Sequence, residues 1–166
     1  MTSYFSFRFF IVACLISITT LLSWSPKQSS LHKSLRSYRS QSNTEKDILF
    51  YVNDYRSRKG LPALEMNVDI AAQAEKHSVD MATNKVGFGH DGFEDRVKII
   101  SKKISNIHSS AENVAYGNLS PKEVVDIWLR SPGHRKNIEG KYTLTGIGIA
   151  TGKDNIIFFT EIFTSK

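Results

Sequence analysis

Three short segments of this chain carry side chains that bind protons or metal ions. Each has the composition of a turn or of the end of an element, which is where a rigid scaffold usually displays working residues. The imidazoles of His90 and His134 titrate in the range useful for acid–base chemistry, and the Glu112 carboxylate can orient one of them. Two neutral imidazoles and a carboxylate also suit zinc, with water as the fourth ligand. The segments are Phe88-Gly89-His90, Ala111-Glu112-Asn113 and Ser131-Pro132-Gly133-His134-Arg135.

The same residues leave three roles open. As catalysts, His90, Glu112 and His134 lack an evident nucleophile, because Ser131 fits equally well as a helix cap before Pro132. As metal ligands, His90 and His134 would hold zinc. As a polar network, Glu112 and Asn113 would bind loop amides and His134 would tie a loop to the sheet, leaving a binding cleft without chemistry.

The charge of the chain is concentrated at its N-terminus. Residues 1–43 hold five bases and no acid, a net of +5, so the total of +6 leaves only +1 for residues 44–166. A nearly neutral domain argues against nucleic-acid binding. The only cysteine, Cys14, lies in the N-terminal apolar run, so residues 44–166 have neither a disulfide nor a thiolate ligand.

The N-terminus has the pattern of a targeting segment. Residues 9–22 contain no charge and follow Arg8. That length is typical of the apolar part of a signal peptide, roughly 7–15 residues, and is short for a spanning helix of about 20. We predict that residues 1–24 are a signal peptide or an N-terminal membrane anchor. The bases that follow would favour a cytoplasmic domain if the anchor stayed uncleaved, but export is the favoured outcome. The composition of residues 25–43, rich in serine and glutamine with scattered bases, predicts a disordered basic linker.

Helical periodicity dominates the first part of the domain. A helix is expected from Asn43 to Gly60, with Arg56 in a solvated basic end. A second is expected from Asn67 or Asp69 through Asn84, with His77 either packed or exposed near its middle. A third begins at Ser120-Pro121-Lys122-Glu123, where Ser120 and Glu123 form a capping box and proline occupies the first helical position.

The C-terminal part has the period of β-strands. Residues 144–150 and 156–163 are β-branched or aromatic runs joined by a polar turn, which predicts a hairpin. The second run is apolar on both faces and is therefore expected to be a central strand covered on both sides. Gly146 and Gly148 would allow close approach to this sheet. Helices followed by a doubly covered sheet predict an α+β fold, a three-layer α-β-α sandwich.

A set of phrases between residues 48 and 163 resembles the CAP domain (cysteine-rich secretory proteins, antigen 5, pathogenesis-related 1), in the cysteine-free form common in bacteria. The resemblance implies a mainly antiparallel central sheet within residues 44–166 and an extracellular or cell-envelope location. The matching phrases are Asn53-Asp54-Tyr55-Arg56, Gly60-Leu61-Pro62-Ala63-Leu64, Ala71 through Met81, Phe88-Gly89-His90, Glu112-Asn113-Val114-Ala115, Trp128 through Ile138, and Gly146-Ile147-Gly148.

The family cleft is lined by two histidines and two acids. Carried over by motif, His90, Glu112 and His134 fill three of these positions, whereas the fourth falls at Ser131, which is not an acid. The last strand reads Thr160-Glu161 where the family often has Thr-Gln. The resemblance therefore implies a ligand-binding set of His90, Glu112, Asn113, Ser131, His134 and Glu161, with zinc on His90 and His134 as the candidate metal site.

These observations lead to one expectation and two alternatives. We expect an exported or membrane-tethered protein whose cleft binds a lipid, a surface polymer or a protein partner. One alternative is a metal-assisted hydrolase. The other is an interaction module that acts through its outer surface.

Overall fold

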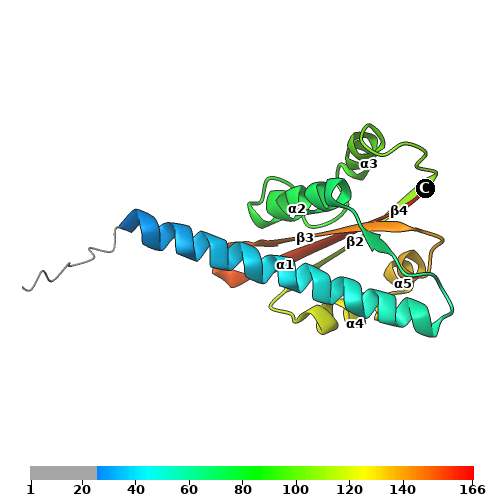
Figure 1. Ribbon diagram of the computed structural model, residues 1–166, viewed down its shortest axis with the longest axis horizontal. Helices are drawn as coiled ribbons and strands as arrows, with labels where there is room; N and C mark the ends of the chain where they lie inside the picture. Colours follow the sequence, from blue (N-terminus) through cyan, green and yellow to red (C-terminus); the bar gives the residue numbers. More distant parts are fainter. Residues whose placement is uncertain (1–25) are drawn as a thin grey trace, which may run out of the picture.

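The computed structural model describes residues 26–166, in which helices lie on both sides of one sheet (Figure 1). The elements are α1 (Pro26–Arg58), β1 (Glu65–Met66), α2 (Val68–Ala82), α3 (Phe93–Ser101), β2 (Ser109–Gly117), α4 (Pro121–Arg130), α5 (Pro132–Ile138), β3 (Leu144–Thr151), the short 3₁₀ turn η1 (Lys153–Asn155) and β4 (Ile157–Ser165). Within this range no helix is long and apolar enough to cross a membrane. The signal or anchor predicted for residues 1–24 lies outside the described part of the chain.

The sheet has the order β1-β3-β4-β2. Strand β4 pairs antiparallel with both β2 and β3, while β1 pairs parallel with β3 over two residues. The predicted hairpin and the central position of its second strand are therefore confirmed. So is the mainly antiparallel α-β-α sandwich: α2 and α3 lie on one side of the sheet and α1, α4 and α5 on the other (Figure 1).

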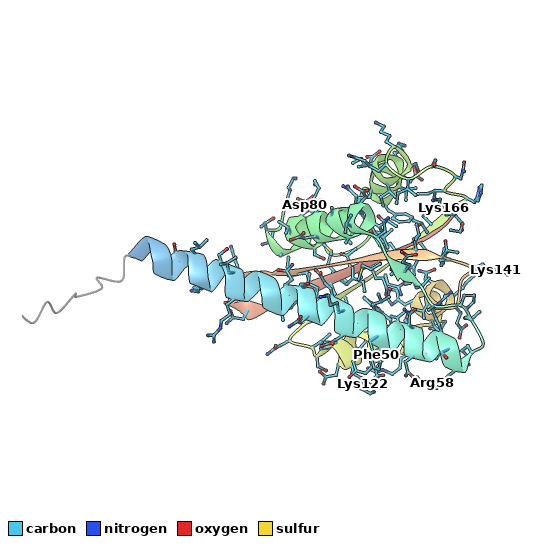
Figure 2. All side chains as sticks on the ribbon, in the orientation of Figure 1. Phe50, Arg58, Asp80, Lys122, Lys141 and Lys166 are labelled. Atoms are coloured by element: carbon cyan, nitrogen blue, oxygen red, sulfur yellow. The ribbon has the colours of Figure 1, made fainter. Side chains whose placement is uncertain are left out.

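Each face of the sheet has its own apolar core, and side chains fill the space beneath the helices (Figure 2). On the α1 side the core is built around Trp128, and on the α2 side it is built around Ile162. A Cβ on Gly148 would lie 1.9 Å from the backbone nitrogen of Glu75, and one on Gly146 would lie 2.2 Å from that of Ala71. The two glycines therefore set the close packing of α2 on β3, as predicted.

The helix starts follow from local capping. Asn67 accepts hydrogen bonds from the amides of Asp69 and Ile70 at 2.9 and 3.2 Å, which begins α2. Ser120 and Glu123 form the expected capping box before α4, with Pro121 at its first position.

The linker prediction for residues 25–43 was wrong, because α1 begins at Pro26 and runs without a break to Arg58. The segment from Lys27 to Arg58 contains neither glycine nor proline. Its leucine, lysine, arginine and glutamine residues are good helix formers, so the absence of a core-facing stripe near its start does not end the helix. The side chain of Gln41 donates to the carbonyl of Ile149, which joins this part of α1 to the sheet.

The prediction of a solvated helix end at Arg56 was also wrong. Arg56 is 1% exposed. Its guanidinium donates to four carbonyls in the loops beside the end of α1, those of Pro62, Ile138, Gly140 and Tyr142, at 2.6–3.3 Å. Arginine suits this position because its donors form a rigid fork that several carbonyls can share. Arg56 therefore fixes the connection from α5 to β3.

Candidate functional site

The structure brings together two of the three residues that opened the sequence analysis. His90 lies in the loop between α2 and α3, and Glu112 lies on β2. The His90 Nδ1–H group donates to Glu112 Oε1 at 2.9 Å. The side chain of Glu112 is 1% exposed, whereas that of His90 is 50% exposed. In the tautomer that carries its proton on Nδ1, Nε2 keeps its lone pair and can accept a hydrogen bond.

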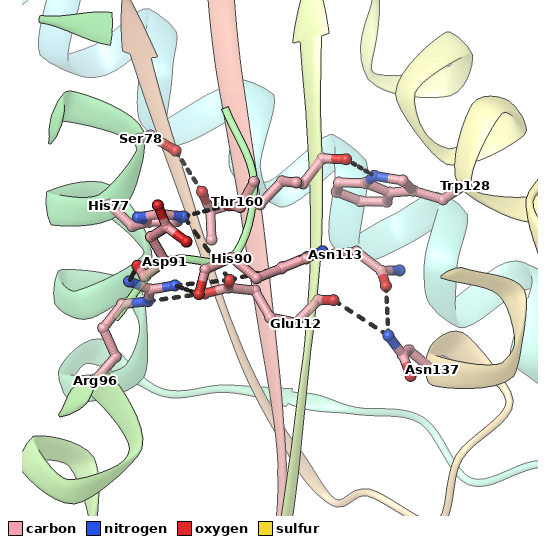
Figure 3. Close-up of polar contacts among 12 residues, drawn as sticks. His77, Ser78, His90, Asp91, Arg96, Glu112, Asn113, Trp128, Asn137 and Thr160 are labelled. Atoms are coloured by element: carbon pink, nitrogen blue, oxygen red, sulfur yellow. Dashed lines mark hydrogen bonds and ion pairs between the residues drawn. The ribbon is translucent and has the colours of Figure 1, made fainter. Parts of the chain in front are cut away.

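Arg96 neutralises the buried carboxylate of Glu112. Its Nε donates to Oε2 at 2.9 Å and its Nη2 to Oε1 at 2.7 Å, so the contact is bidentate (Figure 3). Nη1 also donates to the carbonyl of Asp91 at 2.8 Å. Arg96 therefore holds both the acid and the loop that carries His90.

A second histidine, His77 on α2, lies against the same carboxylate. Its Nε2–H donates to the carbonyl of Gly89 at 2.8 Å and is 3.8 Å from Glu112 Oε1. Burial lowers the pKa of His77, so the ring is neutral at neutral pH. The neighbouring Ser78 donates to the carbonyl of Gly148 at 2.9 Å, which fixes this turn of α2 on the sheet. His77 is thus a support for the loop, buried beneath it.

The third residue, His134, is placed by α5 on the other side of β2. Its carbonyl accepts from Asn113 Nδ2 at 3.1 Å. Its Nδ1 is buried and has no hydrogen-bond partner within residues 26–166. Burial lowers the pKa of the His134 imidazole and the charge of His90 lowers it further, so the two rings lie within electrostatic reach. Both histidines therefore border the outer edge of β2.

Side chains from α4 and α5 cover the outer edge of β2. Strand β2 is the last strand of the sheet. Asn137 Nδ2 donates to the carbonyl of Glu112 at 3.1 Å, and Trp128 Nε1 donates to the carbonyl of Val114 at 3.1 Å (Figure 3). Satisfying two edge carbonyls in this way protects the strand from pairing with another chain. Trp128 is also part of the core.

Other residues of the predicted set lie apart from His90. Consecutive strand residues point to opposite faces, so Asn113 faces away from Glu112 towards Asn137 (Figure 3). Glu161 is the cross-strand partner of Asn113 and lies on that same face. It is fully buried and accepts a hydrogen bond from Thr145 Oγ1 at 3.1 Å. Burial raises its pKa to about 8, so Glu161 is protonated at neutral pH.

Ser131 is both the C-cap of α4 and the N-cap of α5. Its amide donates to the carbonyls of Ile127 and Trp128, and its carbonyl accepts from Arg135 at 2.9 Å. Its side chain makes no capping hydrogen bond. Ser131 therefore sets the direction of the helix that delivers His134.

The residues present do not fit a catalytic zinc centre, the metal that the family resemblance suggests. Such a centre takes three protein ligands and leaves one position open. Both oxygens of Glu112 already accept from Arg96 or His90, which leaves the two imidazoles of His90 and His134. In the described range, no three histidine, cysteine, aspartate or glutamate side chains are arranged to hold a metal ion. The donor set is one ligand short.

A row of aromatic rings continues the site along β2. Phe88, two residues before His90, packs edge-on against Tyr116 with ring centres 4.7 Å apart, and Tyr116 stacks on Phe158 at 5.9 Å. Phe88 and Tyr116 are 51% and 55% exposed. The two rings place exposed aromatic surface near His90. We call Phe88, Tyr116 and Phe158 the aromatic row.

Arg96, His77 and the aromatic row were missed by sequence reasoning as parts of the site. The sequence predicted only that His77 is packed or exposed, and it gave Arg96 no role in the site. One signal was present: Glu112, an acid flanked by apolar strand residues, needed a buried cation that no neighbour along β2 supplies. Nothing in the sequence pattern selects Arg96 among the bases.

Comparison with known proteins identifies relatives of this chain. Two curated proteins of Bacillus subtilis (strain 168) are similar to it. "Uncharacterized protein YkwD" is 31% identical over 107 residues, which is 63% of this chain and 41% of that protein. "Uncharacterized membrane protein YlbC" is 32% identical over 114 residues, 66% of this chain and 32% of that protein. The chain thus spans less than half the length of either relative.

Solved structures share the fold. An extracellular protein containing an SCP domain from Bacillus anthracis is 30% identical with a TM-score of 0.64, over 76% of this chain and 41% of that one. An outer surface protein from Borrelia burgdorferi is 22% identical with a TM-score of 0.63, over 74% of this chain and 95% of that one. At that identity the second likeness supports the fold alone.

The family assignment rests on most of the domain. The match extends over residues 49–163 and carries the description "CAP: Cysteine-rich secretory protein family". It includes α2 to α5, β1 to β3, most of β4 and both histidines of the site. This chain therefore belongs to the CAP family of cysteine-rich secretory proteins.

Proposed function

We propose that this chain is an exported or membrane-tethered CAP domain that binds a hydroxyl-rich surface polymer, a glycan, along the outer edge of β2. The apolar segment at residues 9–22 and the extracellular and membrane relatives support this location. The observation that carries the binding proposal is His90, whose ring is half exposed, fixed through Nδ1 by a buried carboxylate, and next to the aromatic row.

The chemistry of this edge matches a sugar better than a lipid. The His90 ring, which donates through Nδ1 to Glu112, leaves Nε2 facing a hydroxyl group. His134 supplies a second imidazole, whose pKa is lowered by burial. The aromatic row offers ring faces whose negative quadrupole attracts the C–H bonds on the apolar side of a pyranose. Phe88 and Tyr116 keep about half of their surface exposed, which suits a ligand that lies across them.

A metal-assisted hydrolase is less well supported because, among the described residues, the donor set is one ligand short. Docking through the outer surface alone is also less well supported. It would give no reason for a fixed imidazole beside exposed aromatic rings.

The test is calorimetric titration of the purified full chain with chito-oligosaccharides, soluble chains of linked N-acetylhexosamines. Tyr116→Ala and His90→Gln should each weaken binding by about tenfold, since each removes an interaction worth about 1–1.5 kcal/mol. Phe50→Ala is the matched control, because Phe50 is 64% exposed on α1, on the opposite side of the sheet.

Binding that survives both site variants unchanged would refute the proposed cleft. A folded chain that binds no glycan, but binds a fatty acid and loses it in Tyr116→Ala, would replace the polymer with a lipid at the same site.

A further inference from the structure

The first half of α1 extends beyond the sheet and the other helices (Figure 1). We call residues 26–40 the arm. Gln41 donates to the carbonyl of Ile149 and so joins α1 to the sheet. Lys33 and Arg36 border a hollow beside Gln41, at the same end of β3 and β4. From Ile48 onwards α1 contributes to the core, with Ile48 and Val52 completely buried.

The arm carries two exposed leucines on one face. Leu31 is 58% exposed and Leu35 is 56% exposed. Residues four apart in a helix lie one above the other, so the two side chains form a continuous apolar stripe. By contrast, a leucine of the domain core such as Leu64 is only 4% exposed. The stripe is therefore an apolar surface that the domain does not cover.

The charge around this stripe is of one sign. Residues 26–43 contain four bases and no acid, while residues 44–166 are nearly neutral. Lys33 and Arg36 are both exposed. A helix that combines an apolar stripe with lysine and arginine elsewhere on its surface has the composition of helices that lie in the interface of an anionic membrane.

The position of the arm in the chain also favours a membrane-surface location. Only three residues separate the end of the apolar segment, Leu22, from the start of the helix at Pro26. Three residues reach about 10 Å at most. A segment that enters a bilayer would therefore bring the arm to the surface of that bilayer.

We propose that the arm is a membrane-surface helix, with Leu31 and Leu35 in the interface of an anionic lipid bilayer and the bases held by the headgroups. Each base near such a surface is worth about fivefold in the ratio of docked to free arm. This proposal does not depend on the glycan cleft, because the cleft residues lie along β2, whereas α1 is joined to the sheet at β3.

The test places a single cysteine for an environment-sensitive fluorophore in the full chain carrying Cys14→Ser. Labels at Leu31→Cys, at Leu35→Cys and, as the control, at Asp47→Cys are compared in vesicles of phosphatidylglycerol and of phosphatidylcholine. Asp47 is exposed on the same helix within the domain. We expect a blue shift and quenching by brominated lipid at the two leucine positions in phosphatidylglycerol only, with no change at Asp47.

The charge is tested on the same labelled chain. Lys33→Gln/Arg36→Gln should lower the ratio of docked to free arm by about 25-fold, because two bases are lost. Labels at the leucine positions that stay as exposed as the one at Asp47 would overturn the proposal. A blue shift that needs no lipid and grows with protein concentration would also overturn it, in favour of pairing with a second copy.

Discussion

The bidentate contact between Arg96 and Glu112 makes a strong prediction for Arg96→Leu. The substitution removes two charge-assisted hydrogen bonds and leaves the carboxylate buried, with His90 as its remaining charged or polar partner at hydrogen-bond distance. It also removes the donor to the carbonyl of Asp91, which steadies the loop that carries His90. We expect a large loss of stability together with a disordered site.

The magnitude follows from burial. The Arg96 and Glu112 side chains are 10% and 1% exposed, so solvent screens the pair little. Removing one partner of a buried pair costs about 3–5 kcal/mol, mainly because the other charge stays buried without compensation. For a domain of this size, each kcal/mol lowers the melting temperature by roughly 2–4 °C. The melting temperature should therefore fall by roughly 10 °C.

The assay is equilibrium unfolding in urea, followed by tryptophan fluorescence of the purified chain. The double variant Arg96→Leu/Glu112→Leu should recover most of the lost stability, because it removes both charges together. Lys98→Gln is the control: Lys98 lies on the same helix, and its ion pair with Asp95 is exposed, so its loss should leave the unfolding midpoint unchanged.

A cost below about 1 kcal/mol for Arg96→Leu would refute this reasoning, because a solvated pair behaves in that way. So would a double variant less stable than either single variant, since the two residues would then act independently of each other.

Three further outcomes are expected. Glu161 has a pKa of about 8 in the folded chain and 4.5 as an ordinary carboxyl, so the folded state binds the extra proton and stability should fall as the pH rises from about 4.5 to 8. In urea titrations across this range, Glu161→Gln should remove the contribution of Glu161, at most about 5 kcal/mol, and leave that of Glu45, whose pKa is raised to about 7. Gly148→Ala should cost about 3 kcal/mol or more, because the added Cβ meets the backbone of α2, whereas Gly133→Ala meets no atom within 4 Å and should be nearly neutral. Zinc titration at neutral pH should give binding weaker than micromolar, since His90 and His134 supply only two ligands; tight binding lost in the double alanine variant would restore the hydrolase alternative.

Local signals determined much of the fold before any contact was known. The capping box at Ser120 and Glu123, the cap at Asn67 and the period-two runs in the last strands each act within a few residues. The CAP phrases added the order of the layers and named His90, Glu112 and His134. These features are readable because propensity and periodicity are properties of neighbouring residues.

The start of α1 shows where such signals fail. Its serines and bases have no apolar period, so residues 25–43 resembled a linker, yet neither glycine nor proline interrupts the helix. Arg56 failed for a different reason. Its partners are carbonyls of residues 62–142, brought together only when α1 packs against the loop before β3.

The sequence by itself determined the family, the layers and the three residue types of the site, because those depend on local pattern and on shared phrases. Only the tertiary structure decided which atoms meet. Strand pleating separates Asn113 and Glu161 from Glu112, and the packing of α2 and α3 brings His77 and Arg96 to the same carboxylate. Which face of a strand a residue takes, and which distant cation neutralises it, depend on register and on helix packing over long sequence separations, and no local pattern encodes these.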